Sequence, residues 1–394
     1  MKIFSFKSKC FIFVSTIIAS CLLQIAVTLS TCHASEAEYG VAVIHDVMVS
    51  MRDGVKLSTN IYLPTRNGEI VPEKLPAILR RTPYNKDTAQ GVANYYTSRG
   101  YAVVFQDTRG RYKSEGGWHW MTDDGKDGYD CCEWIGEQTW SNGIIGMYGG
   151  SYEGGTQHAI AMEKAPNLKT IIPVDAVSNM GYASMRNGGA FELRFWNWIF
   201  RTSADGSRQS RDPGTRAILQ EMKKDKKSYL FNLPLRKGTT PLKLAPEYED
   251  WLVEGMKHGA NDEFWAQNNI IDYTDRYKDM PVYFVGGWYD SWGSNTTASY
   301  MALSRRKIKG PLYLIMGPWI HGSQGYSAHG QVSFGKDAAI SDPLAWRLEW
   351  YDHWLKGIDN TVGKSAPFST PVRIFIMGTG DGRRDTNGKL YHGG

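Results

Sequence analysis

The chain has 394 residues, of which 42% are hydrophobic and 22% are charged, a balance that is typical of globular proteins and excludes wholesale disorder. Its formal net charge of +5 falls to +2 beyond residue 34, because the first 34 residues contain three lysines and no acid. This nearly neutral remainder gives no electrostatic reason to expect a nucleic-acid partner.

Residues 1–34 are predicted to be a secretory signal peptide. A basic start is followed by an apolar run over residues 10–29, and small residues precede Ser35 at the spacing of a cleavage site. An uncleaved helical anchor and a lipid anchor, the latter suggested by residues 18–21, stay open as alternatives. We therefore expect an exported protein that has no stable membrane partner unless this segment is an anchor.

The next elements predicted are the two strands of a β-hairpin, over residues 41–51 and 55–63, with an Asp-Gly turn between them. Short apolar runs predict six further strands, at residues 77–79, 101–106, 144–148, 170–174, 282–285 and 312–316. Helical patterns lie between several of these runs. Strands that alternate with helices predict a mostly parallel α/β sheet that is covered on both faces.

One of these helices is expected from residue 122 to about 138, with an acidic first turn. Its acidic run at 123–128 only superficially resembles a calcium loop, because the twelfth position is Trp134 instead of glutamate. Cys131 and Cys132, the two cysteines outside the signal segment, are adjacent and too few for a closed zinc site. We expect a small buried pair, with no disulfide framework and no metal site.

Residues 178–278 and the end of the chain depart from the alternation of strands and helices. No strand-like run stands out in residues 178–278, so we expect a helical insertion that covers the active edge of the sheet, with the lysine-rich run at 223–227 in solvent. Residues 371–377 alternate like a strand, which either pairs with the main sheet or opens a further domain.

A serine flanked by glycines follows the strand predicted at 144–148. The sequence Gly-Gly-Ser-Tyr-Glu-Gly at 149–154 places Ser151 between this strand and a helical pattern, and a sharp turn there would lift the serine hydroxyl above the sheet. The familiar motif has glycine two residues after the serine, whereas this chain has Glu153. A catalytic serine and a structural turn both fit the pattern.

A catalytic serine needs a histidine base and a carboxylate that orients it, and in sheet hydrolases the order along the chain is serine, acid, histidine. Asp290 follows the strand predicted at 282–285, and His321 follows the strand predicted at 312–316. Both lie just past the carboxyl end of a strand, where open α/β sheets bind ligands. This order and spacing favour Asp290 and His321 as the partners of Ser151.

Three segments together resemble the cocaine esterase-like (CocE/NonD) hydrolases, relatives of X-Pro dipeptidyl-peptidases of the S15 type, α-amino acid ester hydrolases and glutaryl-cephalosporin acylases. They are residues 149–154, Val-Gly-Gly-Trp-Tyr-Asp at 285–290 and Gly-Pro-Trp-Ile-His-Gly at 317–322. Residues 51–57, followed by 60–62, match the family's opening hairpin, and residues 81–86 and 106–111 match two further signatures. The resemblance runs from about residue 40 to the end of the chain.

The resemblance implies a role for each site residue. Ser151 is the nucleophile, His321 the general base and Asp290 its orienting carboxylate. The oxyanion hole is formed by the backbone N–H of Tyr152 and the hydroxyl of Tyr84. The family's turn carries tyrosine after the serine and glycine three residues after it, as this chain does. A triad needs no cofactor, and we expect none.

The family has an α/β-hydrolase domain with an inserted helical cap and a C-terminal jelly-roll domain. The resemblance therefore divides this chain into a signal peptide (1–34), the first part of the hydrolase domain (35–177), the cap (178–278), the second part of the hydrolase domain (279–368) and the start of a jelly roll (369–394). A jelly roll needs eight strands, so the chain is expected to be truncated or a natural fragment.

The resemblance also bears on the substrate. In α-amino acid ester hydrolases, part of the carboxylate cluster that holds the substrate ammonium lies two and three residues after the triad aspartate, where this chain has Trp292 and Gly293. An ammonium buried there would be unpaired, so α-amino esters are disfavoured. Only Glu192 is a weak candidate to anchor a free N-terminus. Trp288, Trp292 and Trp319 are expected to seat the substrate.

The sequence thus predicts a serine hydrolase that acts on a small-molecule ester or amide, or on a short peptide, through an acyl-enzyme. An X-Pro dipeptidyl-peptidase or an α-amino acid ester hydrolase of the same fold is one alternative. A truncated, non-catalytic surface or binding protein is another, and homo-oligomer formation is left open.

Overall fold

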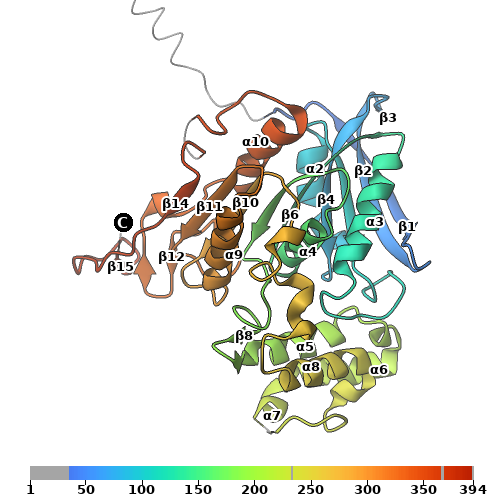
Figure 1. Cartoon of the computed structure of the whole chain (residues 1–394), viewed down its shortest axis with the longest axis vertical. Coiled ribbons are helices and arrows are strands. Elements are labelled where there is room, and N and C mark those ends of the chain that lie inside the picture. Colours follow the sequence, from blue (N-terminus) through green and yellow to red (C-terminus); the bar gives the residue numbers. More distant parts are fainter. Residues whose placement is uncertain (1–34, 232–233, 365–367, 393–394) are drawn as a thin grey trace, which may run out of the picture. The chain divides into compact units, whose positions relative to one another are not determined.

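The computed structural model describes residues 35–231, 234–364 and 368–392 (Figure 1). The predicted signal peptide lies outside these ranges. Within them, no helix combines the length and the apolar character that a membrane span requires. Residues from Ser35 onward group into one unit.

The apolar runs form a mixed sheet that has ten strands in the described residues, in the order β1-β2-β5-β4-β6-β7-β10-β11-β14, with β3 paired to β2. The strands are β1 (Gly40–Ser50), β2 (Lys56–Arg66), β3 (Glu69–Ile70), β4 (Leu75–Thr82), β5 (Ala102–Asp107), β6 (Ser141–Gly150), β7 (Leu168–Val174), β10 (Val282–Gly287), β11 (Leu312–Gly317) and β14 (Val372–Ile374). β1 and β2 form the predicted antiparallel hairpin, and neighbours from β5 to β14 are parallel. The expected hairpin and mostly parallel sheet are confirmed.

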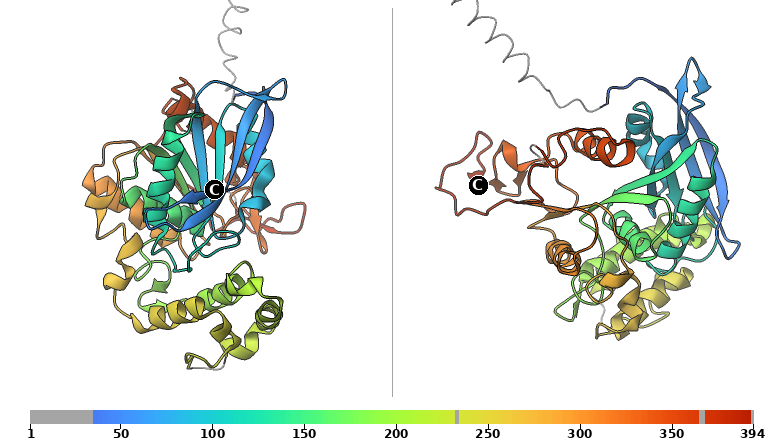
Figure 2. Two further views of the ribbon diagram at one scale, coloured as in Figure 1. Left: turned by 90° about the vertical axis from the view of Figure 1, so that its right-hand side faces the viewer. Right: turned by 45° about the horizontal axis from the view of Figure 1, so that its top comes forward.

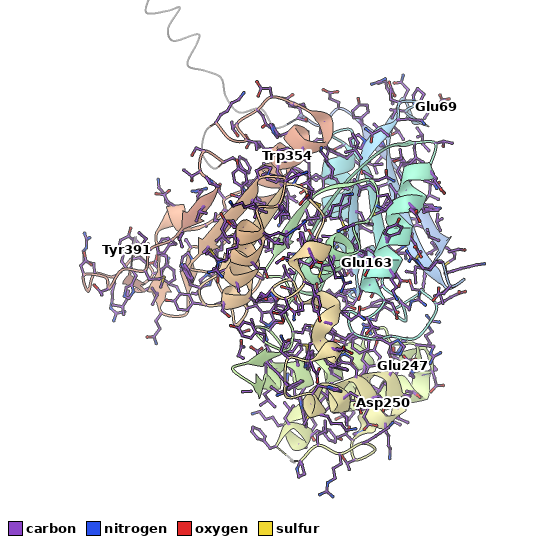
Figure 3. All side chains as sticks on the ribbon, viewed as in Figure 1. Glu69, Glu163, Glu247, Asp250, Trp354 and Tyr391 are labelled. Atoms are coloured by element: carbon purple, nitrogen blue, oxygen red, sulfur yellow. The ribbon has the colours of Figure 1, made fainter. Side chains whose placement is uncertain are left out.

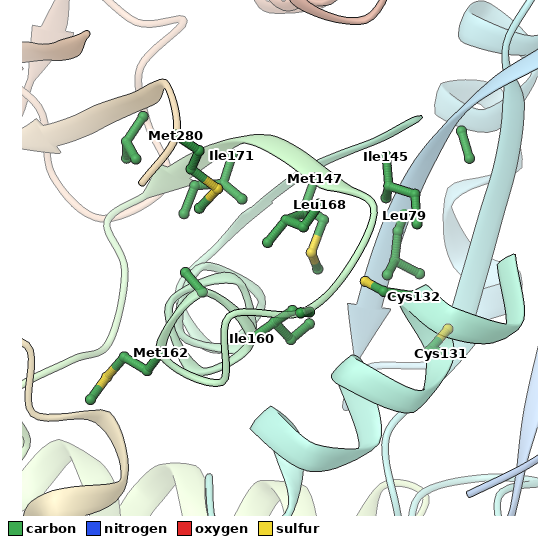
Figure 4. Packing of buried hydrophobic residues seen from close by; sticks show 14 of the residues in the cluster. Leu79, Cys131, Cys132, Ile145, Met147, Ile160, Met162, Leu168, Ile171 and Met280 are labelled. Atoms are coloured by element: carbon green, nitrogen blue, oxygen red, sulfur yellow. The ribbon is translucent and has the colours of Figure 1, made fainter. Parts of the chain in front are cut away.

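Helices cover both faces of this sheet (Figure 2). They are α2 (Gln90–Thr97), α3 (Asp124–Glu137), α4 (Tyr152–Met162), α9 (Gly293–Arg306) and α10 (Pro343–Lys356). On the face of α3 and α4, Cys131, Cys132 and Ile160 pack against residues of β4, β6 and β7 (Figure 4). Both cysteines are buried and unbridged, and burial raises the pKa of the Cys131 thiol to about 12.

The acidic run at 123–128 connects the start of α3 to the sheet through contacts with arginine side chains. Arg81 of β4 is fully buried, and its guanidinium donates to the backbone carbonyl of Asp124 (2.6 Å) and to the side chain of Gln106 (2.8 Å). Asp127 pairs with Arg109 (2.6 Å). Asp123 is the N-cap residue of α3, but its side chain makes no capping hydrogen bond. The acidic residues therefore begin the helix, as predicted, and balance the charges of buried Arg81 and partly buried Arg109.

The insertion between β7 and β10 is helical, as predicted. It contains α5 (Leu193–Ala204), α6 (Pro213–Lys224), α7 (Lys226–Leu230) and α8 (Pro246–Lys257). It also contains a hairpin of β8 (Arg186–Asn187) and β9 (Ala190–Phe191), which the sequence analysis missed because each strand has only two residues. The lysine run at 223–227 is largely exposed, although Lys223 pairs with Asp205 (2.7 Å).

The insertion packs on the loop that follows β5. Trp118 of this loop stacks on Tyr248 of α8, with ring centroids 4.3 Å apart, and Trp120 contacts Trp198 of α5 edge-on. Glu247, labelled in Figure 3, accepts a hydrogen bond from the Trp118 backbone N–H (3.2 Å). This aromatic core holds α5 and α8 beside the carboxyl ends of the strands.

Near the end of the chain, the predicted strand at 371–377 is shorter than expected. Only β14 forms, and it pairs with β11 at the edge of the main sheet. Farther on, β15 (Leu390–Tyr391) pairs with β13 (Val332–Ser333), which also pairs with β12 (Ala328–His329). The division of the chain at residues 177, 278 and 368 stays a prediction.

Gly154→Ala should destabilise the fold, because α4 lies too close to the segment after β7 for a side chain at this position. A Cβ on Gly154 would lie 2.6 Å from the Cβ and 2.9 Å from the Cα of Ala176. Overpacking typically costs about 1–3 kcal/mol, and alanine regains about 1 kcal/mol of helix propensity. Urea unfolding should therefore show a net loss of up to about 2 kcal/mol.

Gly150→Ala is the matched control for this stability measurement. Its Cβ would have Val174 O as its nearest neighbour, at an ordinary 3.6 Å. A loss of stability at Gly150 as large as that at Gly154 would contradict the packing argument.

Candidate active site

The turn between β6 and α4 places Ser151 at the carboxyl edge of the sheet. Ser151 has φ 61° and ψ −122°, a strained conformation that costs a non-glycine residue about 1–3 kcal/mol. Its backbone N–H donates to Val174 O (2.9 Å), and its carbonyl accepts from the N–H groups of Gly154 and Gly155. Gly149, with φ 155°, cannot carry a side chain, because a Cβ there would lie 2.4 Å from the Cβ of Glu153.

Asp290 and His321 come together beside this turn, from the loops after β10 and β11. The Nδ1 atom of His321 lies 2.9 Å from Oδ2 of Asp290. The Asp290 side chain is 1% exposed, and its other oxygen accepts from the backbone N–H of Trp292 (3.2 Å). His321 and Ser151 both line a pocket of about 370 Å³. The structure thus brings Ser151 and His321 to one pocket, and Asp290 contacts His321 without lining that pocket.

Both oxyanion-hole candidates lie beside Ser151. Tyr84, two residues after β4, lines the same pocket, and its hydroxyl accepts from the indole of Trp198 (3.2 Å). Burial raises the pKa of Tyr84, so its hydroxyl keeps its proton at neutral pH. The N–H of Tyr152 belongs to the first turn of α4, where N–H groups lack intrahelical acceptors. The Tyr152 side chain is buried, and its hydroxyl donates to Asp124 (2.6 Å).

The three candidate tryptophans are not among the residues that line this pocket. Trp292 contacts His321 edge-on, with ring centroids 5.1 Å apart. The indole of Trp288 donates to the carbonyl of Phe375 (2.8 Å), and that of Trp319 donates to the carbonyl of Ala338 (2.8 Å). Of the three, only Trp292 touches a candidate catalytic residue.

Asp175 is a site residue that the sequence analysis missed. It follows β7 directly and lines the pocket, and its Oδ2 accepts from the backbone N–H of Gly322 (2.7 Å) and the side chain of Gln324 (2.6 Å). These bonds hold the loop that carries His321. Its position just after a predicted strand, which it shares with Asp290, was the signal that could have found it.

Asp175, Asp290 and His321 could together hold a metal ion, because their ligand atoms lie within 4.8 Å of one another. The hydrogen bond between His321 and Asp290 already uses two of these three groups. Burial and the neighbouring Asp290 raise the pKa of Asp175 to about 6.

Comparison with known protein families shows to which group of hydrolases this chain belongs. A family model described as X-Pro dipeptidyl-peptidase (S15 family) matches residues 53–323, more than half of the chain. The chain belongs to the S15 family. The matched region includes Ser151, Asp290, His321 and both oxyanion-hole candidates, and the resemblance predicted from the motifs is confirmed at the level of the family.

Relatives of this S15 chain include the cocaine esterase of Rhodococcus sp. (strain MB1 Bresler), which is 29% identical over 370 residues. That match covers 90% of this chain and 61% of the esterase. Among solved structures, an α-amino acid ester hydrolase (24% identity, TM-score 0.61, 89% of this chain and 59% of that one) shares the fold. So does a CocE/NonD family hydrolase from Staphylococcus aureus (19% identity, TM-score 0.61, 89–90% of this chain and 60% of that one).

These likenesses establish the predicted α/β-hydrolase fold. The chain spans about three fifths of the length of these three relatives.

Asp175→Asn should change how the stability of this S15 protein depends on pH. An aspartate in an unfolded chain has a pKa of about 3.9, whereas folded Asp175 has a raised pKa of about 6. The contribution of Asp175 to the free energy of unfolding is therefore fully present below about pH 4 and is lost as the pH rises through 6. A permanently neutral asparagine removes this loss.

Thermal unfolding at pH 5 and pH 7.5 measures the effect. The Tm of Asp175→Asn should fall less between these two values than the Tm of the unchanged protein. If the Tm fell equally in the two proteins, Asp175 would have the same pKa in the folded and unfolded states, which would contradict this prediction.

Proposed function

We propose that this protein is an exported serine hydrolase that cleaves ester or amide bonds through an acyl-enzyme on Ser151. The observation that carries the proposal is the 2.9 Å contact between His321 and the buried Asp290, beside a pocket that His321 shares with Ser151. Membership of the S15 family and the relationship to an esterase support it.

In the proposed mechanism, the Ser151 hydroxyl oxygen attacks the substrate carbonyl while Nε2 of His321 takes the hydroxyl proton. Asp290 holds Nδ1–H of His321 and stabilises the imidazolium. The tetrahedral intermediate collapses, the bond to the leaving group breaks, and His321 gives its proton to the departing alcohol or amine. Water, deprotonated by His321, then attacks the acyl-enzyme carbonyl. The bond to the Ser151 oxygen breaks, His321 returns the proton to that oxygen, and the acid is released.

The charge that develops on the carbonyl oxygen in this mechanism is held by the Tyr152 N–H and the Tyr84 hydroxyl. Tyr84 suits this role because its raised pKa keeps it a neutral donor, and the Trp198 indole fixes the position of its oxygen. Trp198 and Tyr84 also link the proposed cap, residues 178–278, to the site.

A second candidate, an X-Pro dipeptidyl-peptidase, is favoured by one observation at Asp175. A peptidase that releases dipeptides must hold the free ammonium of its substrate. Oδ1 of Asp175 is buried in the pocket wall and has no hydrogen-bond partner among the described residues, so it could accept from that ammonium. Glu192 is less suited to this role, because it already pairs with Arg194 (2.7 Å).

Asp290→Asn should lower kcat on p-nitrophenyl butyrate by on the order of 10⁴, because asparagine stabilises neither the required tautomer nor the imidazolium. Ser151→Ala should lower kcat at least as much. The matched control is Asp275→Asn, at an exposed carboxylate in a short 3-10 helix (Thr274–Arg276). Hydrolysis that persists undiminished in the Ser151 and Asp290 variants would refute the triad.

The peptidase alternative predicts rapid release of p-nitroaniline from Ala-Pro-p-nitroanilide, a large loss of rate when the alanine is acetylated, and a similar loss in Asp175→Asn. Acetylation removes the charge that Asp175 would bind. Equal rates on the free and acetylated peptides would exclude a dipeptidyl-peptidase and leave the esterase proposal intact.

A further inference from the structure

Three side chains at the candidate active site lie close enough together to bind one metal ion. Asp175, Asp290 and His321 each have a ligand atom within 4.8 Å of those of the other two. They come from the segments after β7, β10 and β11, which are neighbours in the sheet. Two carboxylates and an imidazole are donors that Zn²⁺ prefers, and atoms that share one zinc ion lie about 3–4 Å apart. A small movement of these side chains is therefore enough to complete a site.

One of the two oxygens of Asp175 is free to bind such an ion. Asp175 is 1% exposed, and its Oδ2 accepts from the backbone N–H of Gly322 (2.7 Å) and the side chain of Gln324 (2.6 Å). Its Oδ1 is buried and has no hydrogen-bond partner among the described residues. A buried acceptor without a partner is costly. A cation bound to Oδ1 would remove this cost, while Oδ2 keeps both of its donors.

The charges around His321 also favour a cation. Asp175 and Asp290 place two carboxylates beside one imidazole. Arg194 lies 3.8 Å from Asp290 but forms its closer ion pair, at 2.7 Å, with Glu192. Among the described residues, no lysine or arginine forms an ion pair with Asp175. With a neutral imidazole, the cluster therefore has an excess of negative charge that a divalent cation would balance.

We propose that Asp175, Asp290 and Nδ1 of His321 bind Zn²⁺ reversibly and that the bound ion inhibits hydrolysis. The inhibition, although not the binding, rests on the proposed function. To take the Ser151 proton, His321 needs a lone pair on Nε2, so its own proton must lie on Nδ1, beside Asp290. Zinc takes the lone pair of Nδ1, and the ring proton moves through solvent to Nε2. Because a protonated Nε2 cannot accept a proton, Ser151 loses its base.

Inhibition is measured on p-nitrophenyl butyrate with protein that carries no affinity tag. Added Zn²⁺ should stop hydrolysis, and EDTA should then restore the full rate. Mg²⁺ should inhibit far less, because it prefers an octahedral shell of oxygen ligands to an imidazole. Undiminished hydrolysis in a large excess of zinc would overturn the proposal, and so would equal inhibition by Mg²⁺.

Asp175→Asn should raise the zinc concentration that halves its own rate by at least about 10-fold, since losing even an outer-shell partner lowers metal affinity by about 10–100-fold. The matched control is His258→Gln. His258 lies 2.7 Å from Asp262 and 3.9 Å from Glu254, in a second cluster of the same residue types whose carboxylates are more exposed. Its sensitivity to zinc should equal that of the unchanged protein. Unchanged sensitivity in Asp175→Asn would contradict the proposal.

Direct binding separates this inference from the proposed function. Equilibrium dialysis of Ser151→Ala, which keeps all three ligands, should show a zinc site that Asp175→Asn or His321→Gln weakens when added to it. Thermal unfolding verifies that each variant is folded. Zinc binding that neither added substitution changes would overturn the proposal, even if the unchanged protein hydrolyses esters. Zinc binding as expected in a protein that hydrolyses no ester would refute only the proposed function.

Discussion

The close approach of α4 to the sheet is the constraint on which the candidate site depends. Because Gly154 lies against Ala176, the helix can begin directly after β6, and the chain turns so sharply that Ser151 adopts a positive φ. This turn puts a hydroxyl and the helix's unpaired N–H groups at the same point of the sheet edge. The loops after β10 and β11 bring Asp290 and His321 to that point.

The distribution of charge around this turn carries the functional argument further. Most charged groups near Ser151 are balanced: Arg80 binds Glu153, and Asp290 binds His321. Asp175 has one oxygen without a hydrogen-bond partner among the described residues. The other oxygen of Asp175 accepts from Gly322 and Gln324 and so holds the loop that carries His321.

Much of this fold could be predicted from the sequence because its signals are local. Apolar runs marked the parallel strands, and the candidate residues of the triad were found because each follows such a run. Arg347 also lines the pocket but gave no signal in the sequence, since it lies on α10, in a distant part of the chain. Trp288 and Trp319 were expected there because they also follow strands, but hydrogen bonds to Phe375 and Ala338 hold their indoles elsewhere. Such tertiary contacts cannot be predicted from the local amino-acid sequence around each residue.

Covalent labelling tests the central claim most directly. A fluorophosphonate reacts with a serine only where a base and an oxyanion hole activate it, and mass spectrometry of the digested protein locates the adduct. The account predicts a single adduct on the peptide that contains Ser151, and its disappearance in Ser151→Ala. An adduct on another residue, or labelling that persists in Ser151→Ala, would contradict the assignment of Ser151 as the nucleophile.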